Sequence, residues 1–286
     1  MRSILPPRLD ALLALGARRL RRSCAGGGTP DLDAELLLAH ALGTSRARLR
    51  SHPEETPDAI RSRRYAELIE RRATGEPLAY IVGYKDFWSL RLSVTPAVLV
   101  PRPETELLVE RALALRAESF AGVADLGTGC GAIALALASE QPGWQVVATD
   151  VSQDALAVAR ANAAALHLGS VEFLHGSWFA PLPGRTFDLI LSNPPYVAED
   201  DRALQDPAVK HEPRTALTPG ADAMACLRAI IYSATPHLEH HGWLLLEHGA
   251  TQGAEVAGEL VGRGFRHVRS HPDLAGHLRM TEGQRQ

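Results

Sequence analysis

Apolar and polar positions in the first 75 residues repeat at the spacing of amphipathic helices. The stretch "RLDALLALGARRL" (8–20) predicts one helix. The stretch "DLDAELLLAHALG" (31–43) predicts a second, which begins at an aspartate and ends at a glycine, and residues 57–75 predict a third. We therefore expect residues 1–75 to form a small helical domain.

The periodicity changes after residue 75. Residues 87–94, "FWSLRLSV", alternate as expected for a strand of a hairpin, and "VPRPETE" (100–106) predicts a proline-stiffened turn that leads into a helix at about Glu106. We interpret residues 76–105 as a hairpin linker between two domains.

From residue 106 to residue 286 the pattern alternates between short apolar runs and helical stretches. The predicted strands cover 123–127, 145–150, 171–176, 187–193, 243–249 and 265–271, and the predicted helices cover 131–141, 153–168, 222–238 and 252–262. Alternating strands and helices favour a parallel sheet with helices on both faces, so we expect an α/β, Rossmann-like domain.

Composition narrows the class of protein. The chain has 286 residues, 45% of them apolar, and its longest apolar runs are too short to span a bilayer. The first residues do not form a convincing signal peptide, so we expect a cytoplasmic protein. Cys24, Cys130 and Cys226 are widely spaced, which predicts reduced thiols and no metal site.

The net charge of −3 is unevenly distributed. Residues 1–75 carry 14 arginines and 9 acidic residues, whereas the remainder carries 16 basic and 24 acidic residues. A basic first domain is compatible with an acidic or nucleic-acid-associated partner, and equally with solvated arginines on a helical bundle.

The sequence "DLGTGCG" (125–131) follows the first strand of the α/β domain. Its glycines, Gly127, Gly129 and Gly131, would let the backbone come close to a ligand, with Thr128 and Cys130 between them. Asp150 ends the second strand, where a carboxylate can accept hydrogen bonds from ribose hydroxyls. The G-x-G-x-G spacing differs from the dinucleotide pattern, and it favours S-adenosylmethionine over NAD.

The sequence "SNPPYV" follows the fourth strand. The Asn193 side-chain oxygen and the rigidly held Pro194 carbonyl can accept hydrogen bonds from the two N–H groups of a planar amide or aromatic amine. Pro195 adds stiffness, and Tyr196 offers a ring that packs on the planar group. The motif therefore predicts a clamp that aligns a weak nitrogen nucleophile with a methyl donor.

Several segments together resemble the release-factor glutamine methyltransferases (HemK/PrmC family). They are "GEPLAYIVGYKDFWSL", "VPRPETELLVE", "DLGTGCGAIALALA", "SNPPYV", "HEPRTAL" and "WLLLEHG". The resemblance covers about residues 8–280. It implies a small helical N-terminal domain that recognises the substrate, and a seven-stranded methyltransferase domain. It also implies methylation of the glutamine N5 in the Gly-Gly-Gln motif of class I peptide chain release factors.

The resemblance assigns roles to single residues. Gly127 to Gly131, Asp150, Trp178 and Asn193 would contact the methyl donor, with Trp178 beside the adenine or, alternatively, in the core. Asn193 to Tyr196 would hold the glutamine. Ser177 and the C-terminal stretch "LRMTEGQRQ" depart from the family pattern, which leaves adenine recognition and the last strand open. We expect a monomer with no membrane contact and no nucleic-acid substrate.

Four other interpretations remain. An N6-adenine methyltransferase on DNA or RNA fits the asparagine–proline–proline–tyrosine motif equally well, although the second domain is acidic and carries no large insertion for target recognition. A glutamine methyltransferase that modifies a ribosomal protein is poorly separated by sequence. An NAD oxidoreductase and a non-catalytic donor-binding module fit less well, because of the glycine spacing and the intact clamp.

Overall fold

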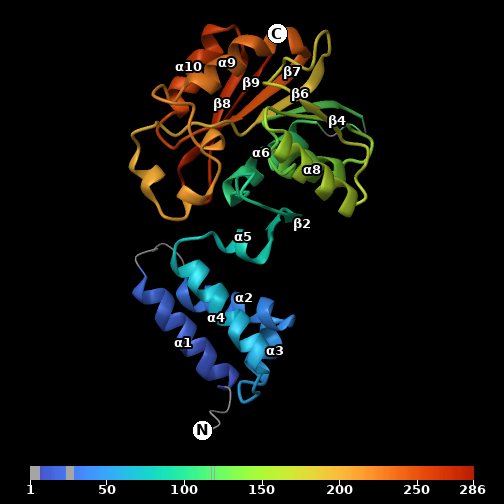
Figure 1. Ribbon diagram of the computed structural model, residues 1–286. Helices are drawn as coiled ribbons and strands as arrows, with labels where there is room; N and C mark the ends of the chain where they lie inside the picture. Colours follow the sequence, from blue (N-terminus) through green and yellow to red (C-terminus); the bar gives the residue numbers. More distant parts are fainter. Residues whose placement is uncertain (1–6, 24–28, 117, 119) are drawn as a thin grey trace, which may run out of the picture. The chain divides into compact units, whose positions relative to one another are not determined.

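The computed structural model describes residues 7–23, 29–116, 118 and 120–286, so Cys24 lies outside the described residues. The chain forms two compact units (Figure 1). The first consists of residues 1–83 with 205–211, and the second of residues 84–204 with 212–286. The segment 205–211 thus belongs with helices that lie more than 120 residues earlier in the chain.

The first unit is helical, as the apolar periodicity predicts. Its helices are α1 (Leu9–Arg22), α2 (Pro30–Leu42), α3 (Arg46–Ser51), α4 (Ala59–Ala73) and α5 (Leu78–Val82). Their apolar faces meet in one core, in which Leu37, Leu38 and Leu49 are almost fully buried. The three predicted helices are confirmed, and Gly43 ends α2 with a left-handed backbone. The short helices α3 and α5 were not predicted.

Many arginines of the first unit face carboxylates of the same unit. Glu35 is nearly buried and accepts hydrogen bonds from Arg46 at 2.8 Å and Arg50 at 2.6 Å. These partners, the Arg50 hydrogen bond foremost, lower the pKa of Glu35 against the effect of burial. Arg63 and Arg64 are exposed. Part of the positive charge of the first unit is therefore paired with carboxylates of the same unit. That the remaining arginines contact a partner stays a prediction.

The second unit contains a two-stranded hairpin and a seven-stranded sheet. Its strands are β1 (Tyr84–Phe87), β2 (Leu90–Ser93), β3 (Gly122–Leu126), β4 (Gln145–Asp150), β5 (Glu172–His175), β6 (Phe187–Ser192), β7 (Leu238–Glu247), β8 (Arg266–Pro272) and β9 (Leu278–Gln284). Its α-helices are α6 (Glu106–Leu115), α7 (Ala132–Glu140), α8 (Gln153–Ala165), α9 (Ala225–Ala234) and α10 (Gly253–Gly262), and short 3₁₀ turns include Pro103–Thr105. The order across the large sheet is β5-β4-β3-β6-β7-β9-β8.

The last strand corrects the expectation of a parallel sheet. Strand β9, which the apolar pattern did not predict, pairs antiparallel with both β7 and β8 and lies between them. The departure of the tail from the family pattern does not prevent strand formation. Within β9, Glu282 is buried and accepts hydrogen bonds from Arg111 at 2.9 and 3.1 Å, so a polar tail is held in the sheet by an internal ion pair.

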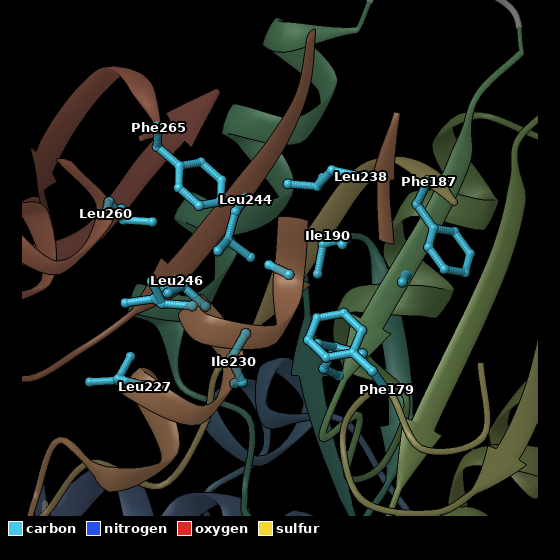
Figure 2. Close-up of a cluster of buried hydrophobic side chains, with 14 of the residues drawn as sticks. Phe179, Phe187, Ile190, Leu227, Ile230, Leu238, Leu244, Leu246, Leu260 and Phe265 are labelled. Atoms are coloured by element: carbon cyan, nitrogen blue, oxygen red, sulfur yellow. The ribbon is translucent and has the colours of Figure 1, made fainter. Parts of the chain in front are cut away.

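Helices cover both faces of the sheet, as expected. On one face α9 and α10 pack on Ile190, Leu244 and Leu246, which form a continuous apolar cluster (Figure 2). The alternate strand residues Leu191 and Leu245 are equally buried and point to the other face, where α6, α7 and α8 contact the central strands. No helix in the described ranges is long and apolar enough to cross a membrane.

The burial of Leu244 gives a prediction for stability. Leu244 is fully buried between β7 and α9, whereas Leu274 is fully exposed in the turn before β9. We expect Leu244→Ala to lower the free energy of unfolding by about 2–5 kcal/mol, through lost burial and the cavity left behind. Leu274→Ala is the matched control and should change it by less than about 0.5 kcal/mol. Urea denaturation of both variants measures the difference, and equal effects would contradict the packing described.

Candidate active site

Strand register brings three polar residues and a glycine to one edge of the sheet. Parallel pairing aligns one row of residues across four strands, namely Thr149, Leu126, Ser192 and Leu246. The residues that follow them in the sequence are Asp150, Gly127, Asn193 and Glu247, respectively. This row stands at the carboxyl ends of the strands, which is where open α/β sheets bind ligands.

A cavity of about 350 Å³ opens at this edge, within the range of small-molecule sites. Most of the predicted residues line it: Gly127, Thr128, Gly129, Cys130, Asp150, Trp178, Asn193 and Pro195. Three predicted residues, Gly131, Pro194 and Tyr196, are not among the lining residues. The wall is completed by Ser177, which the sequence analysis connected with adenine recognition, and by residues to which it gave no role in the site, including Arg102, Thr105, Thr215 and Cys226.

The glycine-rich loop needs left-handed backbone conformations. Gly127, Gly129 and Gly131 have φ values of 75°, 58° and 88°, which residues with a Cβ seldom adopt. A Cβ on Gly127 would lie 3.1 Å from the Trp178 ring, and one on Gly131 would lie 3.0 Å from Leu135. A Cβ on Gly129 would meet nothing within 4 Å, so the loop leaves open space there.

A buried carboxylate supports the loop from below. Asp125 is fully buried, and its Oδ2 accepts hydrogen bonds from the Thr128 hydroxyl at 2.6 Å and from the Ala134 N–H at 3.2 Å. No described residue donates to its Oδ1. Burial raises the pKa of Asp125 to about 7, so the group is held at a considerable electrostatic cost.

Asp150 is placed where a nucleoside site requires an acid. Its two oxygens accept hydrogen bonds from the N–H groups of Gly129 at 2.9 Å and Ser152 at 2.8 Å. Each carboxylate oxygen retains a lone pair that can accept from a ligand. Asp150 thus fixes the glycine loop and also presents acceptors to the cavity.

Trp178 lies between the cavity and the core of the sheet. Its ring lines the cavity over Gly127 and also packs against the apolar cluster of the sheet. Its φ is 48°, which is an outlier for a bulky residue, and its carbonyl accepts a hydrogen bond from the Thr149 hydroxyl at 3.0 Å. Ser177 beside it is exposed and lines the same cavity.

Two hydrogen bonds hold the start of the segment that follows β6. The Ser192 hydroxyl donates to the Leu126 carbonyl at 2.7 Å, which ties the end of β6 to β3. The Asn193 Nδ2 donates to the Thr105 Oγ1 at 3.0 Å. With one N–H of this amide bonded to Thr105, the Asn193 carbonyl oxygen is available to accept a hydrogen bond from a ligand in the cavity.

Tyr196 connects this segment to β7. Its hydroxyl donates to Glu247 Oε1 at 3.1 Å, and burial raises the pKa of the Tyr196 phenol. Gln252 donates to the Tyr196 carbonyl at 3.2 Å and accepts from the Gly249 N–H at 2.7 Å. Tyr196 therefore links the segment after β6 to β7, and its packing on the substrate stays a prediction.

Two further polar contacts were missed by sequence reasoning. Asn162 of α8 donates to the carbonyl oxygens of Cys130 and Ser93, which joins the glycine loop to the hairpin. Arg102 lines the cavity and donates to the buried Glu212 at 2.6 Å. The residues in each of these contacts are far apart in the sequence, so local patterns do not predict the contacts. Arg102 and Glu212 nevertheless lie in the segments "VPRPETELLVE" and "HEPRTAL" that carry the resemblance.

Comparisons with known proteins identify the family. The PrmC N-terminal domain model matches residues 11–83, and the methyltransferase small domain model matches residues 103–222. A release factor glutamine methyltransferase of Pseudomonas aeruginosa is 49% identical over 253 residues, which cover 88% of this chain and 92% of that protein. The chain belongs to the release factor glutamine methyltransferase family.

Another member of the family, from Coxiella burnetii, is 46% identical over 258 residues, with 90% of this chain and 92% of that protein covered. Among solved structures, a T. thermophilus 16S rRNA N2 G1207 methyltransferase in complex with AdoMet and guanosine superposes with a TM-score of 0.52. It is 18% identical and the match covers 71% of this chain and 50% of that chain, so it shows the fold that the family shares with other methyltransferases.

The buried Asp125 gives a prediction for the pH dependence of stability in this family member. Its folded pKa of about 7 exceeds the ordinary value of 3.8, so the folded state retains a proton that the unfolded state releases between these values. Stability from this group therefore falls as pH rises from about 4 to 7. Asp125→Asn lacks this dependence. We expect its stability relative to wild type to increase with pH, by up to about 1.4 kcal/mol per pH unit.

Chemical denaturation of both proteins at pH 4.5 to 7.5 measures this difference. Asp200→Asn, which removes an exposed carboxylate, controls for the loss of charge. Parallel curves for Asp125→Asn and wild type would show that Asp125 is already ionised in the folded protein throughout this range.

Proposed function

We propose that this chain transfers a methyl group from S-adenosylmethionine to N5 of the glutamine in the Gly-Gly-Gln motif of class I peptide chain release factors. Membership of the family supports the activity. The observation that carries the chemistry is the orientation of Asn193, whose Nδ2 is bonded to Thr105 so that its carbonyl oxygen is available at the cavity.

The residues of the cavity fit the methyl donor. The open space at Gly129 allows a close approach of the amino-acid part of the ligand, and Asp150 offers acceptors for ribose hydroxyls. Trp178 supplies an apolar surface suited to a base. When bound, the donor supplies a methyl group on a positively charged sulfur, which leaves as a neutral thioether.

The clamp acts on the glutamine. An amide nitrogen is a weak nucleophile because its lone pair is delocalised. Acceptors at Asn193 and at the Pro194 carbonyl would hold its two N–H groups and align the nitrogen with the methyl group. As the new C–N bond forms, positive charge passes to the nitrogen and a proton is lost to water. Acceptors aimed at the N–H groups act most strongly at that stage.

The remaining assignments follow from this proposal. Residues 1–75 would recognise the release factor, and the enzyme would act as a monomer in the cytoplasm, where translation termination takes place. Ribosomal proteins, DNA and RNA are the alternative acceptors, because the clamp fits any planar amino group.

The direct test uses purified protein, methyl-labelled donor and four acceptors: a class I release factor, ribosomal proteins, DNA and RNA. We expect label on the release factor, lost when its motif glutamine is replaced by asparagine, which is one methylene too short for the in-line position. Label on nucleic acid alone would overturn the proposal.

Donor binding gives a second prediction. Asp150→Ala should weaken S-adenosylmethionine binding by about 1.5–3 kcal/mol, the usual contribution of hydrogen bonds to a charged group. Calorimetry measures this, with Asp154→Ala, an exposed acid in the first turn of the next helix, as the control. Tighter binding of NAD than of S-adenosylmethionine by wild type would contradict the donor assignment.

The clamp gives a third prediction. Asn193→Ala should retain the fold and most of the donor affinity but lower kcat by roughly 10²- to 10³-fold, as expected for loss of one positioned transition-state hydrogen bond. Single-turnover kinetics on the release factor measures the loss. Near-normal turnover would mean that Asn193 does not hold the nucleophile.

A further inference from the structure

The clamp segment, residues 193–196, lacks the usual means of holding a backbone in place. Pro194 and Pro195 have no N–H group, so neither can donate a hydrogen bond. Residues 193–198 also form no helix or strand, so no ladder of backbone hydrogen bonds supports them. The position of the clamp segment therefore depends on contacts from other parts of the chain.

The peptide unit between Tyr196 and Val197 is bonded on both sides. The Val197 N–H donates to the Leu217 carbonyl at 3.1 Å. On the other side, Gln252 Nε2 donates to the Tyr196 carbonyl at 3.2 Å and, more weakly, to the Ala223 carbonyl at 3.5 Å. The plane of this peptide is thus fixed, and with it the end of the clamp segment.

The orientation of the Gln252 amide is determined by its partners. Its Oε1 accepts from the Gly249 N–H at 2.7 Å, and a backbone N–H can only donate. Its Nε2 faces two backbone carbonyl oxygens, which can only accept. A glutamine satisfies both sides, whereas a glutamate carboxylate of the same length has no N–H to donate and a methionine has neither group.

The turn that carries Gln252 is itself fixed to the sheet. The Gln252 N–H donates to the Gly249 carbonyl at 2.9 Å, and Nδ1 of the buried His248 donates to the same oxygen at 2.9 Å. His248 Nε2 is bonded in turn to the Thr281 hydroxyl of β9 at 2.8 Å. A Cβ on Gly249 would lie 3.0 Å from Gln252 Oε1, so the glutamine side chain lies closely over this glycine. Gln252 therefore connects the clamp segment to the sheet.

Gln252 is half-buried and is not among the residues that line the cavity. We propose that Gln252 is a positioning residue that, through the Tyr196 carbonyl, holds the clamp segment with its acceptors directed at the substrate glutamine. This inference rests on the proposed function, because a fixed clamp segment matters for aligning the glutamine nitrogen with the methyl group. A misplacement of reacting groups by about 1 Å can cost roughly 100-fold in rate.

Two substitutions separate the bond to Tyr196 from the bond to Gly249. Gln252→Glu, assayed at about pH 8 where an ordinary carboxyl group is ionised, can still accept from Gly249 but cannot donate to Tyr196. Gln252→Met has a similar length and loses both bonds. We expect both variants to lower kcat on the release factor about 10- to 100-fold, while the affinity for S-adenosylmethionine, measured by calorimetry, stays within about threefold of wild type.

Thr251→Ala is the matched control, because Thr251 is an exposed residue of the same turn, and its kcat should equal that of wild type. Rates are counted per donor-binding site found by calorimetry, so an incompletely folded variant does not imitate a slow one. A kcat for Gln252→Glu within about threefold of wild type would overturn the inference, since the bond to Tyr196 would not be needed. Loss of donor binding by both variants would also overturn it, because Gln252 would then serve the fold as a whole.

A double-mutant cycle decides whether Gln252 acts on the clamp. In the Asn193→Ala background one of the two acceptors is absent, so Gln252→Glu should cost less in kcat than it does in wild type. Full additivity of the two substitutions would overturn the inference alone. Absence of methyl transfer to the release factor by wild type would overturn the proposed function, and this inference with it.

Discussion

The alignment of β4, β3, β6 and β7 in one register is the constraint on which the site depends. Backbone hydrogen bonds place Asp150, Gly127, Asn193 and Glu247 in a single row, although they come from positions spread over 120 residues of sequence. A slip of one residue in any strand would turn its last side chain to the opposite face. Because β6 and β7 are apolar on both faces, the close packing of individual side chains in the core, rather than an apolar–polar alternation, holds them in this register.

The same edge carries two buried carboxyl groups with pKa values raised to about 7, Asp125 and Glu247. Apolar replacements would cost less to bury, so stability does not account for them. Each accepts a hydrogen bond from a hydroxyl near the cavity: Asp125 from Thr128 of the glycine loop, and Glu247 from Tyr196 of the segment after β6. The buried carboxyl groups thus help to fix the glycine loop and the segment after β6, at a cost in the free energy of folding.

The sequence alone predicted those parts of the site that depend on the backbone preferences of neighbouring residues. Glycines permit the left-handed backbone that the loop needs, and consecutive prolines restrict their own backbone, so the loop and the segment after β6 could be located without knowledge of the fold. The contacts of Thr105 and Glu247 could not, because the two bonds join residues 88 and 51 positions apart and follow from strand order. Apolar periodicity also missed strand β9 itself, whose buried residues include the polar Thr281 and Glu282, and periodicity does not show that β9 lies between β7 and β8.

The clamp alone does not explain a choice of substrate. An acceptor oxygen at Asn193 would serve an adenine amino group as well as a glutamine amide, since both are planar and present two N–H groups. Discrimination must therefore come from what can reach the clamp. Among the residues that line the cavity, Arg102 is basic, but its charge is paired with the buried Glu212. The second unit as a whole carries more acidic than basic residues, and this negative charge disfavours the many phosphates of a nucleic acid. A glutamine flanked by glycines brings neither charge nor bulk.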